Sequence, residues 1–205
     1  MSTKLKSILL ILIVLIIDQA SKIYVKLHFS LGESVEIFNW FQICFIENRG
    51  MAFGMELGGK AGKLFLTLFR IAAVGFLVYY IRSLIKKQAR TGFILTVSLL
   101  LVGAAGNIFD SLFYGILFSE STMYQVAAFL PEGGGYAPLF FGKVVDMLYF
   151  PIIKNAAGQT VFFSPIFNIA DSAITIAVFL TLIFFRKELN DSLETKKQKH
   201  VEKSK

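Results

Sequence analysis

Four long apolar runs follow one another along the chain, and charged or polar residues stand between them. They predict helices at about residues 5–27, 62–82, 92–118 and 165–185. A helix needs roughly 20 apolar residues to cross the hydrocarbon core of a bilayer, because each residue advances the helix by about 1.5 Å. The pattern therefore predicts an all-α integral membrane protein with four transmembrane helices.

The first connection, residues 28–61, has a different pattern. Residues 35–46 are rich in β-branched and aromatic side chains, which favour strands. We expect a small extracytoplasmic β-rich subdomain between the first two helices. It would lie partly in the membrane interface, where Trp40 is favoured.

The second long connection, residues 119–161, contains the glycine-rich stretch 131–135. Its centre lacks the periodicity of a packed element, so we expect the part at 119–142 to be a mobile lid. We treat residues 1–189 as one membrane-embedded domain, and residues 190–205 as a basic tail.

Composition supports a membrane protein and excludes several other classes. Hydrophobic residues make up 55% of the 205 residues and charged residues only 17%. The net charge of +7 could indicate nucleic-acid binding, but the basic residues gather at the ends of the apolar runs. One cysteine, Cys44, and two distant histidines provide neither a disulfide framework nor a zinc pattern. We therefore expect no nucleic acid, no metal and no cofactor.

The positions of the basic residues predict the orientation. Lysines and arginines are concentrated at the N-terminus, in the connection between the second and third helices, and in the tail. The positive-inside rule assigns these segments to the cytoplasm. Both termini would then be cytoplasmic, and the connections 28–61 and 119–161 would face outward.

Polar residues interrupt the apolar runs near the end predicted to face outward. They are Asp18 and Lys22 in the first run, Asn107 and Asp110 in the third, Asp146 before the fourth, and Asn168 and Asp171 at its start. Ionisable groups inside a membrane are costly unless they are paired or line a cavity. Their clustering near one face predicts a functional site there.

Asp146 and Asp171 each lie at the edge of a strongly apolar run. Two carboxylates brought together can share one proton, activate water and protonate a leaving amine, as aspartic proteases do. Intramembrane carboxylates also serve proton-coupled transport, so a small transporter is the alternative. From the pattern alone, Asp146 could be a solvated loop residue, and Asp171 could simply cap a helix. A Cys44 nucleophile lacks a neighbouring base, and a serine–lysine pair with Lys143 or Lys154 has little support.

Five motifs in order resemble the lipoprotein signal peptidase (signal peptidase II) family, four-helix aspartic proteases of bacterial inner membranes. They are Asp18-Gln19-x-x-Lys22, Asn48-x-Gly50-x-Ala52-Phe53-Gly54, Gly103-Ala104-x-Gly106-Asn107-x-x-Asp110, Val144-Val145-Asp146, and Phe167-Asn168-x-Ala170-Asp171-Ser172. The transporter predicts midplane polar residues and an internal repeat, and the sequence has neither.

The resemblance implies an activity and a site. Asp146 and Asp171 would be the catalytic pair, and the substrate a prolipoprotein whose lipobox cysteine carries diacylglycerol, cut just before that cysteine. Supporting or substrate-binding residues would be Asp18, Lys22, Asn48, Gly50, Asn107, Asp110, Asn168 and Ala170. The protein would be a monomer in contact with membrane lipids, with its site near the outer face of the inner membrane.

The chain departs from the family pattern in two places. Ser111 stands where the family usually has arginine after the aspartate of the third helix. Residues 115–142 also lengthen the path from that aspartate to Val144-Val145-Asp146. We expect Arg70, inside the second helix, to supply the missing charge within a buried network.

Overall fold

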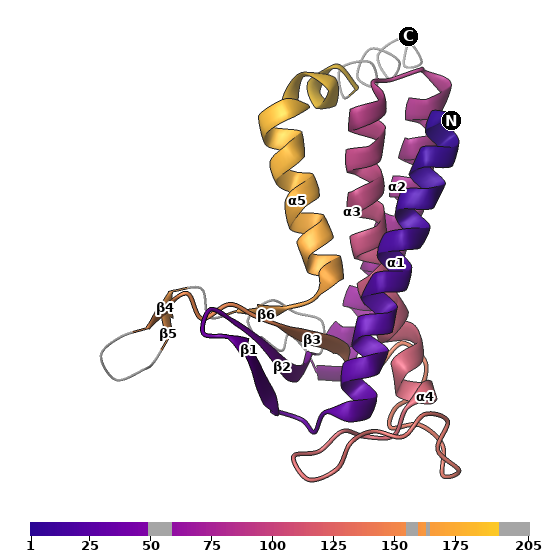
Figure 1. Cartoon of the computed structure of the whole chain (residues 1–205). Helices are drawn as coiled ribbons and strands as arrows, with labels where there is room; N and C mark the ends of the chain where they lie inside the picture. Colours follow the sequence, from indigo (N-terminus) through magenta and orange to yellow (C-terminus); the bar gives the residue numbers. More distant parts are fainter. Residues whose placement is uncertain (49–58, 155–159, 163–164, 193–205) are drawn as a thin grey trace.

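In the computed structural model of the chain, residues 1–48, 59–154, 160–162 and 165–192 are described. The long helices α1 (Thr3–His28), α2 (Gly59–Lys86), α3 (Thr91–Phe109) and α5 (Ile169–Phe184) form one bundle (Figure 1). Helix α3 is central, because it packs against each of the other three. The N-terminus and the C-terminal end of α5 lie at one end of the bundle, and a small sheet lies at the other.

Three helical stretches are long and apolar enough to cross a membrane: Thr3–His28, Gly59–Lys86 and Thr91–Leu117. Helix α5 is followed by a short helix, Arg186–Ser192, at a bend of 88°, and this pair is a possible fourth span. The described chain thus has three or four candidate spans. The exposed side chains of α1, α2 and α5 are largely apolar, as expected for surfaces that face lipid.

The third predicted helix is not one continuous α-helix. After α3 ends at Phe109, residues Asp110–Tyr114 form the π-helix η2, and Gly115–Leu117 form the short helix α4. A π-helix inserts extra backbone into a helical turn and is common at functional sites. Here it begins at Asp110, one of the predicted site residues.

The fourth predicted helix begins later than residue 165. Asn168 has an extended backbone and caps α5 with its side chain, so the helix starts at Ile169. Residues Ile166–Phe167 instead form strand β6. The predicted start of this helix at about residue 165 was therefore too early.

The described residues also form two antiparallel sheets, so the all-α class is not confirmed and the β structure extends beyond the predicted subdomain. Strands β1 (Ser34–Phe38) and β2 (Phe41–Asn48) lie between the first two helices, as predicted. The sheet continues with β3 (Val144–Tyr149) and β6, in the order β1-β2-β3-β6. Strands β4 (Ile153–Lys154) and β5 (Thr160–Phe162) form a separate pair. The β-rich part is therefore assembled from both connections.

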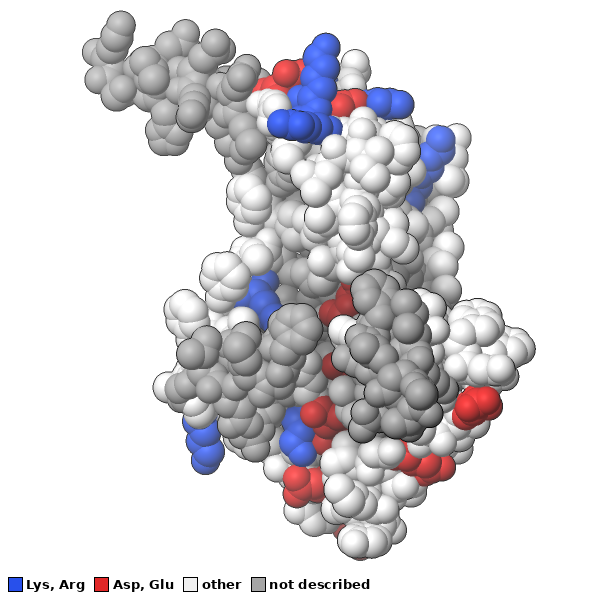
Figure 2. All heavy atoms as spheres, turned by 90° about the vertical axis from the view of Figure 1, so that its left-hand side faces the viewer, with Lys and Arg blue, Asp and Glu red and all other residues white. Residues whose placement is uncertain are grey.

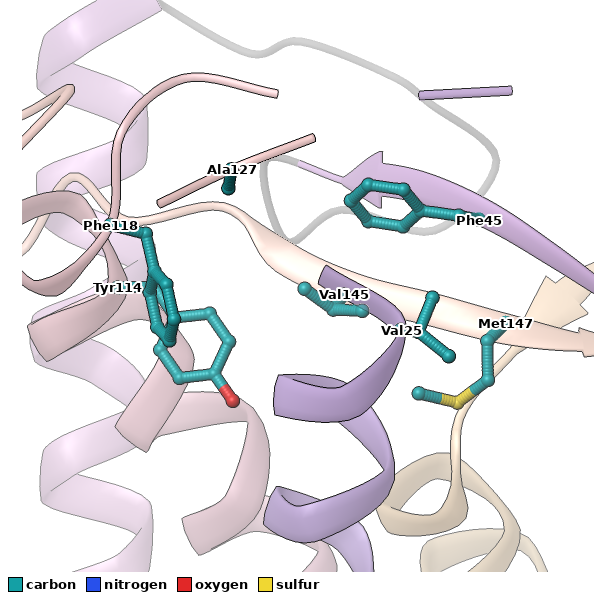
Figure 3. Close-up of a cluster of buried hydrophobic side chains, with 7 residues drawn as sticks. All are labelled: Val25, Phe45, Tyr114, Phe118, Ala127, Val145 and Met147. Carbon is teal, nitrogen blue, oxygen red and sulfur yellow. The ribbon is translucent and has the colours of Figure 1, made fainter. Parts of the chain in front are cut away.

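An apolar core joins this sheet to the helices (Figure 3). Its buried members come from α1, from both central strands, and from the chain after α3: Val25, Phe45, Tyr114, Phe118, Ala127, Val145 and Met147. Burying side chains of this size stabilises the contact by roughly 1.5–3 kcal/mol each. The strand that carries Asp146 is thereby held against α1.

The segment expected to be a mobile lid is part of this packed structure. Ala127 lies in the core, and the Leu31 amide donates to the Thr122 carbonyl at 2.9 Å. Gly142 approaches the backbone so closely that a Cβ there would lie 2.1 Å from the Asp110 carbonyl oxygen. The described part of this insertion therefore packs against the helical bundle, and its movement as a lid stays a prediction.

Charged side chains are unevenly distributed over the face drawn in Figure 2. Lysines and arginines, with some acidic side chains among them, gather at the end of the bundle away from the sheet, and an uncharged band follows below them. Both acidic and basic side chains appear again near the sheet end. This banding matches a protein whose helices cross an apolar layer.

Candidate active site

Asp146 lies on β3, where its side chain is buried between the sheet and the helix ends. Two amides donate to its carboxylate: Asn168 Nδ2 to Oδ1 at 2.6 Å, and Asn48 Nδ2 to Oδ2 at 3.3 Å. Asn48 ends the neighbouring strand β2, so pairing of β2 with β3 positions it. Asp146 is therefore a strand residue with amide donors rather than a solvated loop residue.

Asp171 lies in the first turn of α5, in a capping box with Asn168. The Asp171 amide donates to Asn168 Oδ1 at 2.9 Å, and the Asn168 amide donates back to Asp171 Oδ2 at 3.4 Å. Asn107 Nδ2 donates to Asp171 Oδ1 at 2.8 Å. Asp171 thus has the capping role considered from the sequence, and it also belongs to the polar cluster.

Asn168 connects the two carboxylates. Its side-chain nitrogen contacts Asp146, and its side-chain oxygen and backbone nitrogen contact Asp171. The same nitrogen also donates to Asn107 Oδ1 at 3.0 Å. Because Asn168 is fully buried, the cap of α5 sets the position of both aspartates with little freedom.

Behind the aspartate pair lies a buried ionic cluster. Lys22 Nζ lies 3.0 Å from Asp18 Oδ2 and 2.8 Å from Asp110 Oδ2, and it donates to Asn107 Oδ1 at 3.0 Å. All three charged side chains are at most 1% exposed. A buried charge is tolerable only when it is paired and hydrogen-bonded, and each of these is.

The ionic cluster also holds the backbone on which the aspartates stand. Asp18 Oδ1 accepts from the Ala170 amide at 2.8 Å, next to Asp171. Asp110 Oδ2 accepts from the Val145 amide at 3.3 Å, next to Asp146. The fit requires small residues, because a Cβ at Gly106 would lie 2.6 Å from Asp18 Oδ2.

The environment of Asp146 makes its ionisation difficult. Burial first, and the negative charge of Asp171 second, raise the pKa of Asp146 to about 7, and the two amide donors only partly oppose this. Arg70, on α2, is close enough for the charges of Asp171, Asp110 and Asp146 to act on its guanidinium. Participation of Arg70 in a network stays a prediction.

The structure brings the predicted site residues together, except for Gly50, which lies outside the described residues. Nine of them lie within the described ranges and form the cluster above: Asp146, Asp171, Asp18, Lys22, Asn48, Asn107, Asp110, Asn168 and Ala170. Gly50 lies outside the described residues, as do Ala52, Phe53 and Gly54 of the same motif. Ala170 contributes its backbone amide rather than its side chain.

Residues missed by sequence reasoning complete the cluster. Gln19 Nε2 donates to Asp110 Oδ1 at 2.9 Å and to Asp18 Oδ2 at 3.0 Å. The Tyr114 hydroxyl donates to Gln19 Oε1 at 3.1 Å. Gln19 belongs to the first motif, so its position in that motif was the signal. Tyr114 continues the polar stripe of Asn107 and Asp110 along the same helix, which could have indicated it.

Ser111 contacts a cation from α2. Lys63 Nζ donates to Ser111 Oγ at 3.3 Å, at the position where the resemblance leads one to expect arginine. A lysine on another helix thus reaches the place of the missing side chain.

The arrangement is suited to acid–base chemistry on water. It combines one carboxyl that is protonated near neutral pH, a second carboxylate close by, and buried amides that orient both. Within the described ranges, no three histidine, cysteine, aspartate or glutamate side chains converge as metal ligands would.

Comparison with known proteins matches residues 10–186 to the family model of signal peptidase (SPase) II. The lipoprotein signal peptidase of Porphyromonas gingivalis is 46% identical over 198 residues, covering 92% of this chain and 86% of that protein. The lipoprotein signal peptidase of Amoebophilus asiaticus is 33% identical over 197 residues, covering 89% of this chain and 78% of that protein.

Solved structures agree with these relatives. A bacterial membrane enzyme, solved by the in meso method at 2.3 Å resolution, superposes with a TM-score of 0.57 at 28% identity. The superposition covers 91% of this chain and 90% of that one. A second such structure, at 1.9 Å resolution, has the same TM-score and 29% identity. Matched along most of its length in sequence and in fold, the chain belongs to the signal peptidase II family.

Proposed function

We propose that Asp146 and Asp171 are the catalytic pair of this membrane aspartic endopeptidase, which removes the signal peptide from diacylglyceryl-modified prolipoproteins by cutting before the lipid-modified cysteine. Membership of the signal peptidase II family supports the activity. The observation that carries the residue assignment is the contact of Asn168 with both aspartates, across 2.6 Å to Asp146 and 2.9 Å from the Asp171 amide.

The surroundings of the two carboxyls suggest which one acts as the acid and which as the base. Asp146, with its pKa raised to about 7, holds the shared proton over much of the neutral range. Asp171 receives a hydrogen bond from Asn107 and stands in the first turn of α5, where the helix dipole favours negative charge. We assign the acid role to Asp146 and the base role to Asp171, while the proton belongs to the pair as a whole.

The reaction then proceeds in two proton transfers. Asp171 removes a proton from a water molecule as its oxygen attacks the scissile carbonyl, and Asp146 donates a hydrogen bond to that carbonyl oxygen. The tetrahedral intermediate collapses when the C–N bond breaks and the leaving amine of the modified cysteine receives a proton from the pair. The signal peptide departs with a new carboxylic acid, which loses its proton to the solvent, and the pair again holds one proton.

The remaining site residues support this pair. Asn48, Asn107 and Asn168 donate to the carboxylates, while Asp18 and Asp110 hold the amides of Ala170 and Val145. Lys22 balances the charge of Asp18 and Asp110. Gly50 is proposed as a substrate-contacting residue on the motif alone.

The chain is a multi-pass membrane protein, and we assign it to the bacterial inner membrane with both termini in the cytoplasm. The basic residues at the N-terminus and in the connection between α2 and α3, at the bundle end away from the sheet, support this orientation. The aspartate pair, at the sheet end, would then lie near the outer face. A substrate anchored there by its acyl chains would be oriented largely by the membrane, and a monomer suffices for the chemistry.

The alternative of a small proton-coupled transporter is disfavoured by the family match over residues 10–186. The deciding experiment incubates the purified protein with a diacylglyceryl-modified prolipoprotein and measures the masses of the products. We expect a new peptide that ends immediately before the modified cysteine. The same prolipoprotein without diacylglycerol should remain intact. Absence of cleavage by folded protein, together with proton uptake in vesicles, would support the transporter instead.

A further inference from the structure

A second buried polar cluster centres on Glu47, beside the catalytic strand but outside the aspartate pair. The Glu47 carboxylate is 2% exposed and pairs with Lys26 of α1, whose side chain is fully buried. It also pairs with Lys143 at 3.0 Å and accepts from Ser121 Oγ at 3.2 Å. Lys143 in turn reaches the exposed Glu120 at 3.3 Å. Four segments of the chain therefore meet at one carboxylate.

Aromatic rings enclose the cations of this cluster. Lys26 Nζ lies 5.1 Å from the ring centre of Tyr136 and 5.5 Å from that of Phe118. Lys143 Nζ also lies 5.1 Å from the ring centre of Tyr136, which belongs to the insertion at residues 115–142. Ring faces stabilise a cation that has lost its water, so the insertion supplies part of the environment that keeps Lys26 charged and buried.

Strand pairing connects this cluster to Asp146. In the antiparallel register of β2 and β3, Glu47 lies opposite Val145, and Ile46 lies opposite Asp146. The residue after Glu47 is Asn48, which donates to Asp146. The partner Lys143 directly precedes β3. Glu47 therefore restrains β2 and the start of β3 at the point where both reach the catalytic carboxyl.

We propose that Glu47 is a positioning residue. With Lys26, Lys143 and Ser121 it fixes strand β3, and it thereby keeps the Asp146 carboxyl buried and correctly oriented. The insertion then acts as a brace for the catalytic strand rather than as a lid. This inference rests on the proposed role of Asp146. Glu47, Lys26, Lys143 and Ser121 are not among the residues of the five motifs, although Glu47 directly precedes Asn48 and Lys143 directly precedes Val144.

Weakening the contacts of Glu47 should change the pKa of Asp146. The charged groups that act on Asp146 are Asp171 of α5 and Lys22 of α1, and its charge also acts on Arg70 of α2. Substitution of Glu47, Lys143 or Ser121 leaves all of these charged groups in place. A β3 strand that shifts or admits water would reduce the burial that raises the Asp146 pKa. The active pH range would then move downward.

The test compares Glu47→Gln, Lys143→Gln and Ser121→Ala with wild type in the prolipoprotein cleavage assay, across pH. Glu36→Gln, on the exposed strand β1, is the matched control and should behave as wild type. We expect kcat to fall about tenfold or more in Glu47→Gln and Lys143→Gln, because small misplacements of a catalytic group are costly. KM should change less than about twofold, and the pH midpoint of kcat should fall by about half a unit or more. A smaller change in the same direction is expected for Ser121→Ala.

Lys143→Gln keeps the test decisive if Glu47→Gln is not recovered folded, since Lys143 is 21% exposed and its loss leaves the Lys26–Glu47 pair intact. Folded Lys143→Gln with wild-type kcat and an unshifted pH profile would overturn the positioning role. Failure of the proposed function has a different signature, because wild type itself would then not cleave the prolipoprotein.

Discussion

The side-chain amide of Asn168 donates a 2.6 Å hydrogen bond to Asp146, although the two residues belong to the cap of α5 and to strand β3. The same asparagine forms the capping box with Asp171. One residue therefore ends the extended segment, starts the helix and spaces the two carboxyls. Because the same residue positions both carboxyls, we expect Asp146 and Asp171 to act together.

Asp146→Asn and Asp171→Asn should each reduce kcat by at least ~10³-fold, because proton transfer requires both carboxyls. The double variant should be scarcely worse than either single variant, since the two residues act as a unit. Single-turnover cleavage of a diacylglyceryl-modified prolipoprotein measures this, with recovery of folded, membrane-inserted protein as the control. Substantial cleavage by either single variant would refute the assignment.

Asp146 should make the fold less stable as the pH rises. Its folded pKa of about 7 lies above the ordinary value of 3.8, so the folded protein keeps a proton that the unfolded chain loses between those values. Stability contributed by this group is therefore greatest in acid and declines through that window. Asp146→Asn cannot ionise and should gain stability relative to wild type between about pH 4 and about pH 7. Melting temperatures in one detergent measure the difference, and a gap that does not grow with pH would contradict the assigned shift.

Lys22→Met should destabilise the protein by about 3–5 kcal/mol, because it leaves two buried carboxylates without their cation. Asp18 and Asp110 both depend on this ammonium group, at 3.0 and 2.8 Å. Denaturation in detergent measures the loss, and Lys6→Met, at an exposed position of the same helix, is the control. Equal stability of the two variants would show that the ionic cluster contributes little.

Arg70→Leu should reduce activity or stability, whereas Arg70→Lys should partly preserve both. The reason is that the charges of Asp171, Asp110 and Asp146 act on the Arg70 guanidinium, so a cation is favoured at this position. Cleavage rates and melting temperatures of the two variants, measured side by side, provide the test. An Arg70→Leu variant that matches wild type in both would show that Arg70 only extends toward an interface.

Reporter fusions should place Lys87 in the cytoplasm and Gly134 outside. Lys87 follows α2 at the basic end of the bundle, and Gly134 lies in a turn of the insertion at the opposite end. A reporter active only outside the cytoplasm should therefore respond at Gly134 alone. A cytoplasmic Gly134 fusion would reverse the proposed orientation.

The sequence by itself determined the membrane class and the strands at 35–46, and it indicated the charged residues of the candidate site. Its first three apolar runs coincide with α1, α2 and the helical stretch Thr91–Leu117 within a few residues, because the burial of apolar length in lipid depends little on tertiary contacts. Aspartates and a lysine inside such runs are so costly that their presence alone indicated a site. The family resemblance added the proposed roles of Asp146 and Asp171.

Only the tertiary structure decided how the sheet is assembled and where the last helix begins. Val144–Tyr149 becomes a strand because β2 offers it a partner about a hundred positions earlier in the chain, and no local pattern records such a pairing. Asn168 starts α5 at Ile169 because its side chain caps the helix while also contacting Asp146 and Asn107. Glu47 and Ser121 looked unremarkable in sequence, since the role proposed for them depends on contacts with Lys26 and Lys143 that form only in the folded chain. Local composition encodes burial in the membrane, whereas contacts between distant segments determine which polar groups meet.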